Sequence, residues 1–137
     1  MKKYINYAFI YAILGLASGV FYREFTKFHD FTGKTALSVT HVHFLTLGTL
    51  FFLITALFVL NTNLEEQKGF KAFVRIHNIA LPFMVIMFYV RGITQVLGTN
   101  LSRGLDASIS GMAGIVHILM AVGIVFFFRS LKKATKI

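Results

Sequence analysis

The stretch from Leu37 to Leu60, LSVTHVHFLTLGTLFFLITALFVL, contains no Asp, Glu, Lys or Arg in 24 consecutive residues. A helix of about 20 apolar residues is long enough to cross the hydrocarbon core of a bilayer. Two histidines, His41 and His43, are the only ionisable side chains in this stretch. The stretch therefore predicts a membrane-spanning helix, and this decides the class of the protein.

Three further apolar runs cover residues 4–22, 72–97 and 107–128. The linkers between the runs are short and polar, which favours antiparallel neighbouring helices. Hydrophobic residues make up 56% of the 137-residue chain, more than a small soluble domain can bury. The sequence predicts an all-α integral membrane four-helix bundle, folded as a single membrane domain over residues 1–137. The first run is interpreted as a retained helix and not as a cleaved signal peptide.

The basic residues lie mostly at the ends of the apolar runs and predict the orientation. If the N-terminus is cytoplasmic, the inner side holds nine Lys and Arg residues and the outer side holds four, which by the positive-inside rule places both termini in the cytoplasm. Because of this distribution, we expect the basic residues behind the net charge of +9 to contact the headgroups of the lipid bilayer, and we do not expect nucleic acid as a partner. The inner residues are Lys2, Lys3, Lys68, Lys71, Arg75, Arg129, Lys132, Lys133 and Lys136, and the outer residues are Arg23, Lys27, Lys34 and Arg103.

A few polar side chains lie at membrane depth, where they usually face the bundle interior and mark function. No carboxylate lies within the runs and the chain has no cysteine, which excludes a dinuclear carboxylate centre and thiolate metal sites. From a helical rise of roughly 1.5 Å per residue, three of these side chains share the outer half of the bilayer, whereas His77 lies deeper. The six residues are His41, His43, His77, Arg91, Gln95 and His117.

Histidines on facing helices in an apolar bundle indicate a haem site, because imidazole is a good ligand for haem iron. The depths favour His43 and His117 as axial ligands of a haem b. Arg91, with Gln95 one turn further out, is expected to lie near the haem propionates. His117 has small residues on its face of the helix, including Gly114 one turn before it, which would suit a flat ligand or ordinary close helix packing.

His41 and His43 are two residues apart on a helix, so their side chains point about 200° away from each other. They are expected to serve two different sites, with His41 as the ligand of a second haem or metal, or else one of them is a ligand and the other forms hydrogen bonds. His77, near the basic inner edge, is interpreted mainly as a hydrogen-bond partner between helices, with metal ligation as the alternative.

The pattern His41-Val42-His43 followed by Leu47-Gly48 resembles the His-x-His helix of the haem–copper oxidase superfamily, in particular the core subunit of cbb3-type oxidases and nitric oxide reductases. The resemblance implies that His41 faces a gas-binding haem and His43 an electron-transfer haem. The chain has no adjacent His-His pair and no His-x-x-x-Tyr, so a copper site is not evident within one protomer. A homo-oligomer, a dimer or a trimer, is expected to complete such sites between protomers.

The whole chain also resembles a small four-helix bacterial membrane family of unknown function. Its opening, MKKYINYAFIYAILGLASGVFYREFTKF, and the stretch LSVTHVHFLTLG carry this resemblance. It implies a multi-pass protein of the bacterial plasma membrane.

Two functions follow from these patterns. The first is a membrane-embedded haem b protein in electron transfer or oxygen and nitric oxide chemistry, an oxidoreductase if it is an enzyme, with a quinone or a redox protein as electron partner. The alternative is a non-redox membrane protein, an accessory subunit or a transporter-like bundle, in which the histidines bridge helices or bind copper or zinc.

Overall fold

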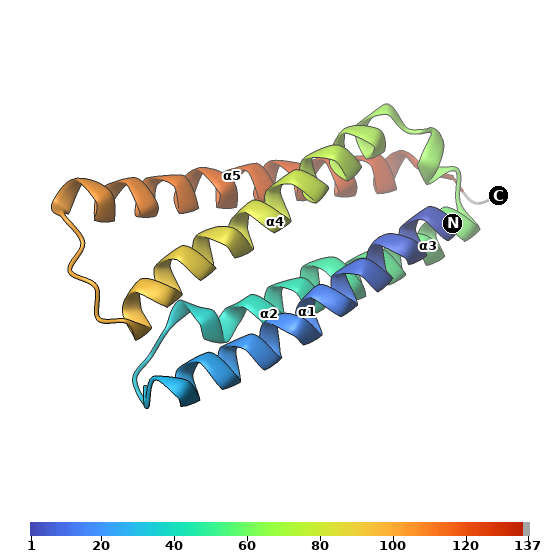
Figure 1. Ribbon diagram of the computed structural model, residues 1–137. Coiled ribbons are helices and arrows are strands. Elements are labelled where there is room, and N and C mark those ends of the chain that lie inside the picture. Colours follow the sequence, from blue (N-terminus) through green and yellow to red (C-terminus); the bar gives the residue numbers. More distant parts are fainter. Residues whose placement is uncertain (136–137) are drawn as a thin grey trace.

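The computed structural model describes residues 1–135, and these residues are helical without a β-strand (Figure 1). Four helical segments are long and apolar enough to cross a membrane: Lys2–Phe28, Ala36–Asn61, Lys68–Val96 and Arg103–Lys133. The prediction of an all-helical chain with four apolar helices is confirmed. Lys136, one of the residues counted in the charge distribution, lies outside the described residues.

Each helical segment is longer than the apolar run that predicted it. The first ends at Phe28 and the last at Lys133, beyond the predicted ends at residues 22 and 128. Lys, Arg and Glu are good helix formers, so they continue a helix after the apolar pattern stops. With 26 to 31 residues, the segments reach roughly 39–46 Å, beyond a hydrocarbon core of about 30 Å. In a bilayer, their polar ends would therefore reach the headgroup region.

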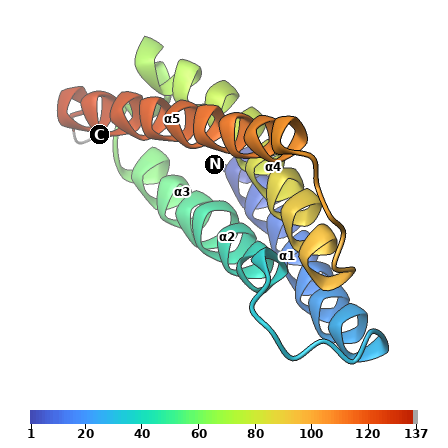
Figure 2. The same cartoon turned by 90° about the vertical axis from the view of Figure 1, so that its left-hand side faces the viewer.

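The helices form two antiparallel pairs (Figures 1 and 2). Helix α1 (Lys2–Phe28) packs along the second span, and α4 (Lys68–Val96) packs along α5 (Arg103–Lys133). The N-terminus, residues 62–67 and residues 134–135 lie at one end, which we call the terminal end. The loops of residues 29–35 and 97–102 lie at the other, the distal end. The N-terminus and residues 134–135 share one end of the bundle, and the cytoplasmic location of the termini stays a prediction.

The second span changes its helical type along its length. It begins with the 3₁₀ segment η1 (Ala36–Val39), continues through one α-helical turn, α2 (Thr40–His43), and widens into the π-helix η2 (Phe44–Leu50). Helix α3 (Phe51–Asn61) completes it. A π-helical turn is rare and is found frequently at functional sites. Both histidines of the opening stretch lie in the turn just before this widened segment.

The packed core lies toward the terminal end. Aromatic rings of Phe52, Phe70, Phe73 and Phe127 meet there at centroid separations between 5.0 and 6.5 Å. The buried residues of α5 are Val116 and residues beyond it. The residues before Val116 have few neighbours. A Cβ atom added at Gly104, Gly111 or Gly114 would have no atom from elsewhere in the described chain within 4 Å.

Candidate functional site

His43, in α2, is held in a single tautomer by the backbone of its own helix. Its Nδ1 atom lies 2.8 Å from the carbonyl oxygen of Val39. A carbonyl oxygen only accepts hydrogen bonds, so Nδ1 must carry the proton, and the neutral ring then has its lone pair on Nε2. No hydrogen bond reaches this Nε2 from any residue that the structure describes. The lone pair is therefore free to bind a metal.

His117, in α5, has the same arrangement. Its Nδ1 lies 2.7 Å from the carbonyl oxygen of Ala113, which again leaves the lone pair on Nε2. The side chain is exposed, as are most residues of α5 from Arg103 to His117. The ring of Phe88, in α4, is a neighbour of both imidazoles, with its centroid 4.7 Å from that of His43 and 5.8 Å from that of His117. The two predicted axial ligands thus share one aromatic neighbour.

His41 lies on the other side of its helix, against α1. Its ring is nearly parallel to that of Tyr22, with 6.5 Å between centroids, and its Cβ lies 3.6 Å from the place of a Cβ at Gly19. Its Nδ1 atom is buried and has no hydrogen-bond partner in residues 1–135. His41 therefore faces α1 and His43 faces α4, so the two imidazoles do not form one chelate.

His77, in α4, is fully buried and joins two spans. Its Nε2 lies 2.8 Å from the carbonyl oxygen of Leu47 in η2, so the proton of this ring is on Nε2, the reverse of His43. The rings of Phe51, Phe52 and Phe73 surround it, with centroids 5.1 to 5.3 Å away. This geometry matches the interpretation of His77 as a helix-bridging hydrogen-bond donor.

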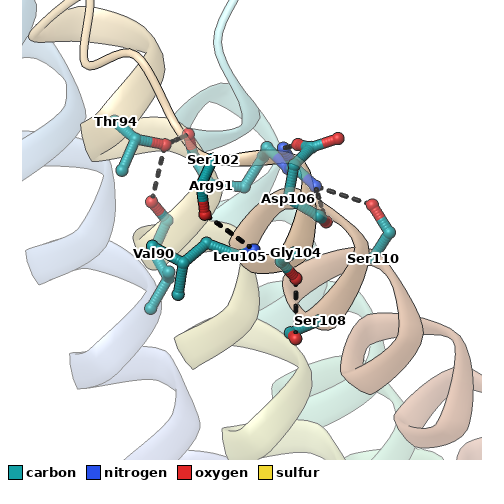
Figure 3. A network of polar contacts seen from close by, with 9 residues as sticks. All are labelled: Val90, Arg91, Thr94, Ser102, Gly104, Leu105, Asp106, Ser108 and Ser110. Carbon is teal, nitrogen blue, oxygen red and sulfur yellow. Dashed lines mark hydrogen bonds and ion pairs between the residues drawn. The ribbon is translucent and has the colours of Figure 1, made fainter.

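Arg91 connects the distal ends of α4 and α5 (Figure 3). Its Nη1 donates to the carboxylate of Asp106, and its Nη2 lies 2.7 Å from the hydroxyl oxygen of Ser110. The guanidinium is thus already paired within the chain, whereas the sequence predicted it near haem propionates. Sequence reasoning counted only carboxylates inside the apolar runs and so missed Asp106, which lies one residue before the fourth run.

Gln95 also has a partner within the chain. Its Oε1 accepts a hydrogen bond of 2.7 Å from the backbone N–H of Ala36, at the start of η1. One turn away, the Thr35 hydroxyl donates to the carbonyl oxygen of Gly92 at 3.0 Å. Gln95 and Arg91 line the same solvent-open hollow at the distal end, with a volume of about 420 Å³. The structure brings these two predicted residues together, but each is engaged by the polypeptide itself.

The predicted residues therefore fall into separate groups. His43 and His117 share the neighbourhood of Phe88, Arg91 follows one turn further along α4, and His41 and His77 lie elsewhere. Among the described residues, no group of three or more His, Cys, Asp or Glu side chains is placed to hold a metal ion. Nothing in the sequence singled out Phe88, which is one of sixteen phenylalanines. Haem ligation requires only one or two imidazoles, so the absence of such a metal-binding group from the described residues does not test the predicted haem site.

Comparison with known proteins identifies the family. Residues 1–134 match the model of a family described as "Protein of unknown function (DUF2871)". Neither the curated proteins nor the solved structures contain a significant match to the chain. The resemblance of the His-x-His helix to the haem–copper oxidases gains no support from these comparisons and stays a prediction. The match extends over nearly the whole chain, and the chain belongs to the DUF2871 family.

Proposed function

We propose that the protein binds haem b within the membrane through His43 and His117 and takes part in electron transfer or in oxygen or nitric oxide chemistry. One observation carries the proposal. Each of the two imidazoles donates from Nδ1 to a backbone carbonyl and keeps an unengaged lone pair on Nε2. A haem-ligating histidine needs this tautomer, and the hydrogen bond at Nδ1 orients the ring and raises its basicity as a ligand.

The surroundings are suited to a porphyrin. Phe88 supplies an aromatic wall beside both imidazoles. On α5, Gly114 lies one turn before His117 with open space where a side chain would project, so a flat group can approach the helix closely. Because the Phe88 ring is in contact range of both imidazoles, a haem bound by both histidines would have to share this space with it.

The open half of α5 also supports the expected homo-oligomer, a dimer or a trimer. His117 and Gly111 lie on a helix that is barely covered by the rest of the chain, so a second copy could close the site. A quinone or a redox protein would then supply or accept the electron. The haem would provide the one-electron or gas-binding chemistry, and the protein would set its potential through axial ligation and burial.

An absorption spectrum of the purified protein tests this proposal. After expression with added haem and purification in mild detergent, we expect a Soret band and, on reduction, α and β bands. His43→Ala and His117→Ala should each remove or convert the low-spin signal. His29→Ala is the matched control, because His29 lies at the exposed end of α1, where its Nδ1 bonds to the Phe25 carbonyl oxygen. This variant should leave the spectrum unchanged.

Two results would contradict the proposal. A colourless protein, even when haem is supplied, would reject haem binding and leave the non-redox alternative, an accessory or transporter-like protein whose histidines bridge helices or bind copper or zinc. A haem spectrum that both alanine variants leave intact would reject His43 and His117 as the ligands. His41, whose buried Nδ1 has no partner in residues 1–135, would be the next residue to replace.

A further inference from the structure

A basic cavity lies at the terminal end, where α4 begins beside the last turns of α5. Its volume is about 650 Å³. Helix α4 contributes Lys68 and Gly69, and α5 contributes Arg129, Ser130 and Lys133. The cavity is remote from the histidines discussed above, so its role is independent of haem binding.

The cavity has an excess of positive charge. Three cationic side chains line it, those of Lys68, Arg129 and Lys133, against one carboxylate, that of Glu66. None of these four groups is in an ion pair among the described residues, where the two ion pairs are Arg23–Glu24 and Arg91–Asp106. An anion in this cavity would therefore be attracted by three cationic side chains, none of which is in an ion pair within the described chain.

The backbone at the cavity wall adds donors to these cations. The N–H groups of Lys68 and Gly69 start α4 and donate to no acceptor in the described chain, since the cap residue Gln67 makes no side-chain cap. Gly69 lies close to α5, because a Cβ there would lie 2.6 Å from the Ser130 hydroxyl oxygen. The two helices therefore meet closely enough to place these amides beside the basic side chains of α5.

A shallow apolar groove, lined by α5 alone, adjoins this cavity. Ile118, Ala121, Val122 and Val125 line the groove, and it shares Phe126 and Arg129 with the basic cavity. From Ile118 to Arg129 the helix rises by roughly 16 Å, close to half of a bilayer core about 30 Å thick. Such a groove has the length and polarity of an acyl chain within one leaflet.

We propose that the basic cavity and the adjoining groove together bind one anionic phospholipid. The phosphate lies among Lys68, Arg129 and Lys133, and an acyl chain runs along the groove toward the middle of the bilayer. Charge selects an anionic headgroup, and the continuous apolar groove selects a lipid over free phosphate. Arg129 is placed at the junction of the two parts.

Lipid binding to the full-length protein in detergent tests this assignment. Native mass spectrometry would count the phosphatidylglycerol and phosphatidylcholine molecules that remain bound as each lipid is titrated. We expect one phosphatidylglycerol to bind preferentially. Arg129→Gln and Lys133→Gln should each weaken it about fivefold, the effect of one cation at a membrane surface. Lys132→Gln is the matched control, because this neighbouring exposed lysine does not line the cavity.

The groove has its own test. Ala121→Phe places a ring in the groove and leaves the basic cavity intact, so it should weaken phosphatidylglycerol binding. Inorganic phosphate at millimolar concentration should not displace the lipid. The assignment would be overturned if the two lipids were retained equally, or if the Arg129 and Lys132 variants had equal effects. It would also be overturned if phosphate displaced the lipid and Ala121→Phe had no effect. Because the haem spectrum is recorded separately, failure of one proposal does not affect the other.

Discussion

At the scale of single residues, the histidines of this chain differ in which nitrogen carries the proton. His43 donates from Nδ1 to its own helix, and His77 donates from Nε2 to a neighbouring span. The first arrangement leaves a lone pair at the tip of the ring, where a metal can reach it. The second uses that tip to join two spans. The two histidines are thus suited to different roles, because each hydrogen-bonds to a backbone carbonyl through a different ring nitrogen.

Replacing His77 by Phe should destabilise the protein without removing a ligand. The aromatic volume among Phe51, Phe52 and Phe73 would be kept, but the carbonyl of Leu47 would lose its hydrogen bond from the imidazole. We expect a loss of about 0.5–1.5 kcal/mol in the free energy of unfolding in detergent, the net contribution of one hydrogen bond. The matched control, His29→Phe, should cause no comparable loss. A His77→Phe protein of normal stability that no longer binds haem would identify His77 as a ligand instead.

The sequence could predict part of this residue-scale picture. The two-residue spacing of His41 and His43 indicates that they point to different sides, and the structure places them against α1 and α4. The tautomers could not be predicted, because they depend on backbone carbonyls whose positions follow from the fold. The same holds for Arg91, whose partner Asp106 is fifteen residues away in sequence and becomes a neighbour only when α5 folds back along α4.

At the scale of elements, the π-helix η2 is the feature least visible in the sequence. Its residues read as a continuous apolar helix, and hydropathy does not distinguish a π-turn from an α-turn. This segment makes two contacts with neighbouring helices. Tyr11 of α1 packs on Gly48, and His77 of α4 donates a hydrogen bond to the Leu47 carbonyl. A carbonyl in a widened turn is available to such a side chain, and the contact joins η2 to α4.

Replacing Gly48 by Ala should separate α1 from η2. The new Cβ would lie 2.5 Å from both Cβ and Cγ of Tyr11, atoms next to the backbone that cannot move without shifting the helix. We expect a loss of about 1–3 kcal/mol in the free energy of unfolding, as for other overpacked sites. Gly111→Ala is the control, because a Cβ there meets no neighbour within the described chain. Equal stability of the two variants would show that α1 and η2 are not packed as described.

At the scale of the whole molecule, four apolar runs were sufficient to predict four helices, because hydropathy alone determines which segments can cross lipid. Their grouping into two pairs, and the sparse cover of the first half of α5, could not be predicted. Each span is apolar on most of its faces, so the sequence does not mark one face as the packed side. The pairing depends on close contacts at particular glycines and aromatic rings.

The orientation of the bundle can be measured directly because the chain has no cysteine. We expect a membrane-impermeant maleimide to label Asn100→Cys in intact cells, and Thr135→Cys only after the cells are made permeable. Asn100 lies in the distal loop and Thr135 at the terminal end, and both are exposed. The cysteine-free parent protein is the control for background labelling. The reverse pattern would place both termini outside the cytoplasm.

The contact between Arg91 and Asp106 bears on how the second helix pair enters the bilayer. If the termini are cytoplasmic, the tip of this pair must be translocated across the hydrocarbon during synthesis, and an isolated charge there is costly. Helices α4 and α5 are joined by residues 97–102 alone, so the two opposite charges can meet before the tip crosses. The ion pair would then be carried across as a nearly neutral unit, and the two helices would insert together as one hairpin.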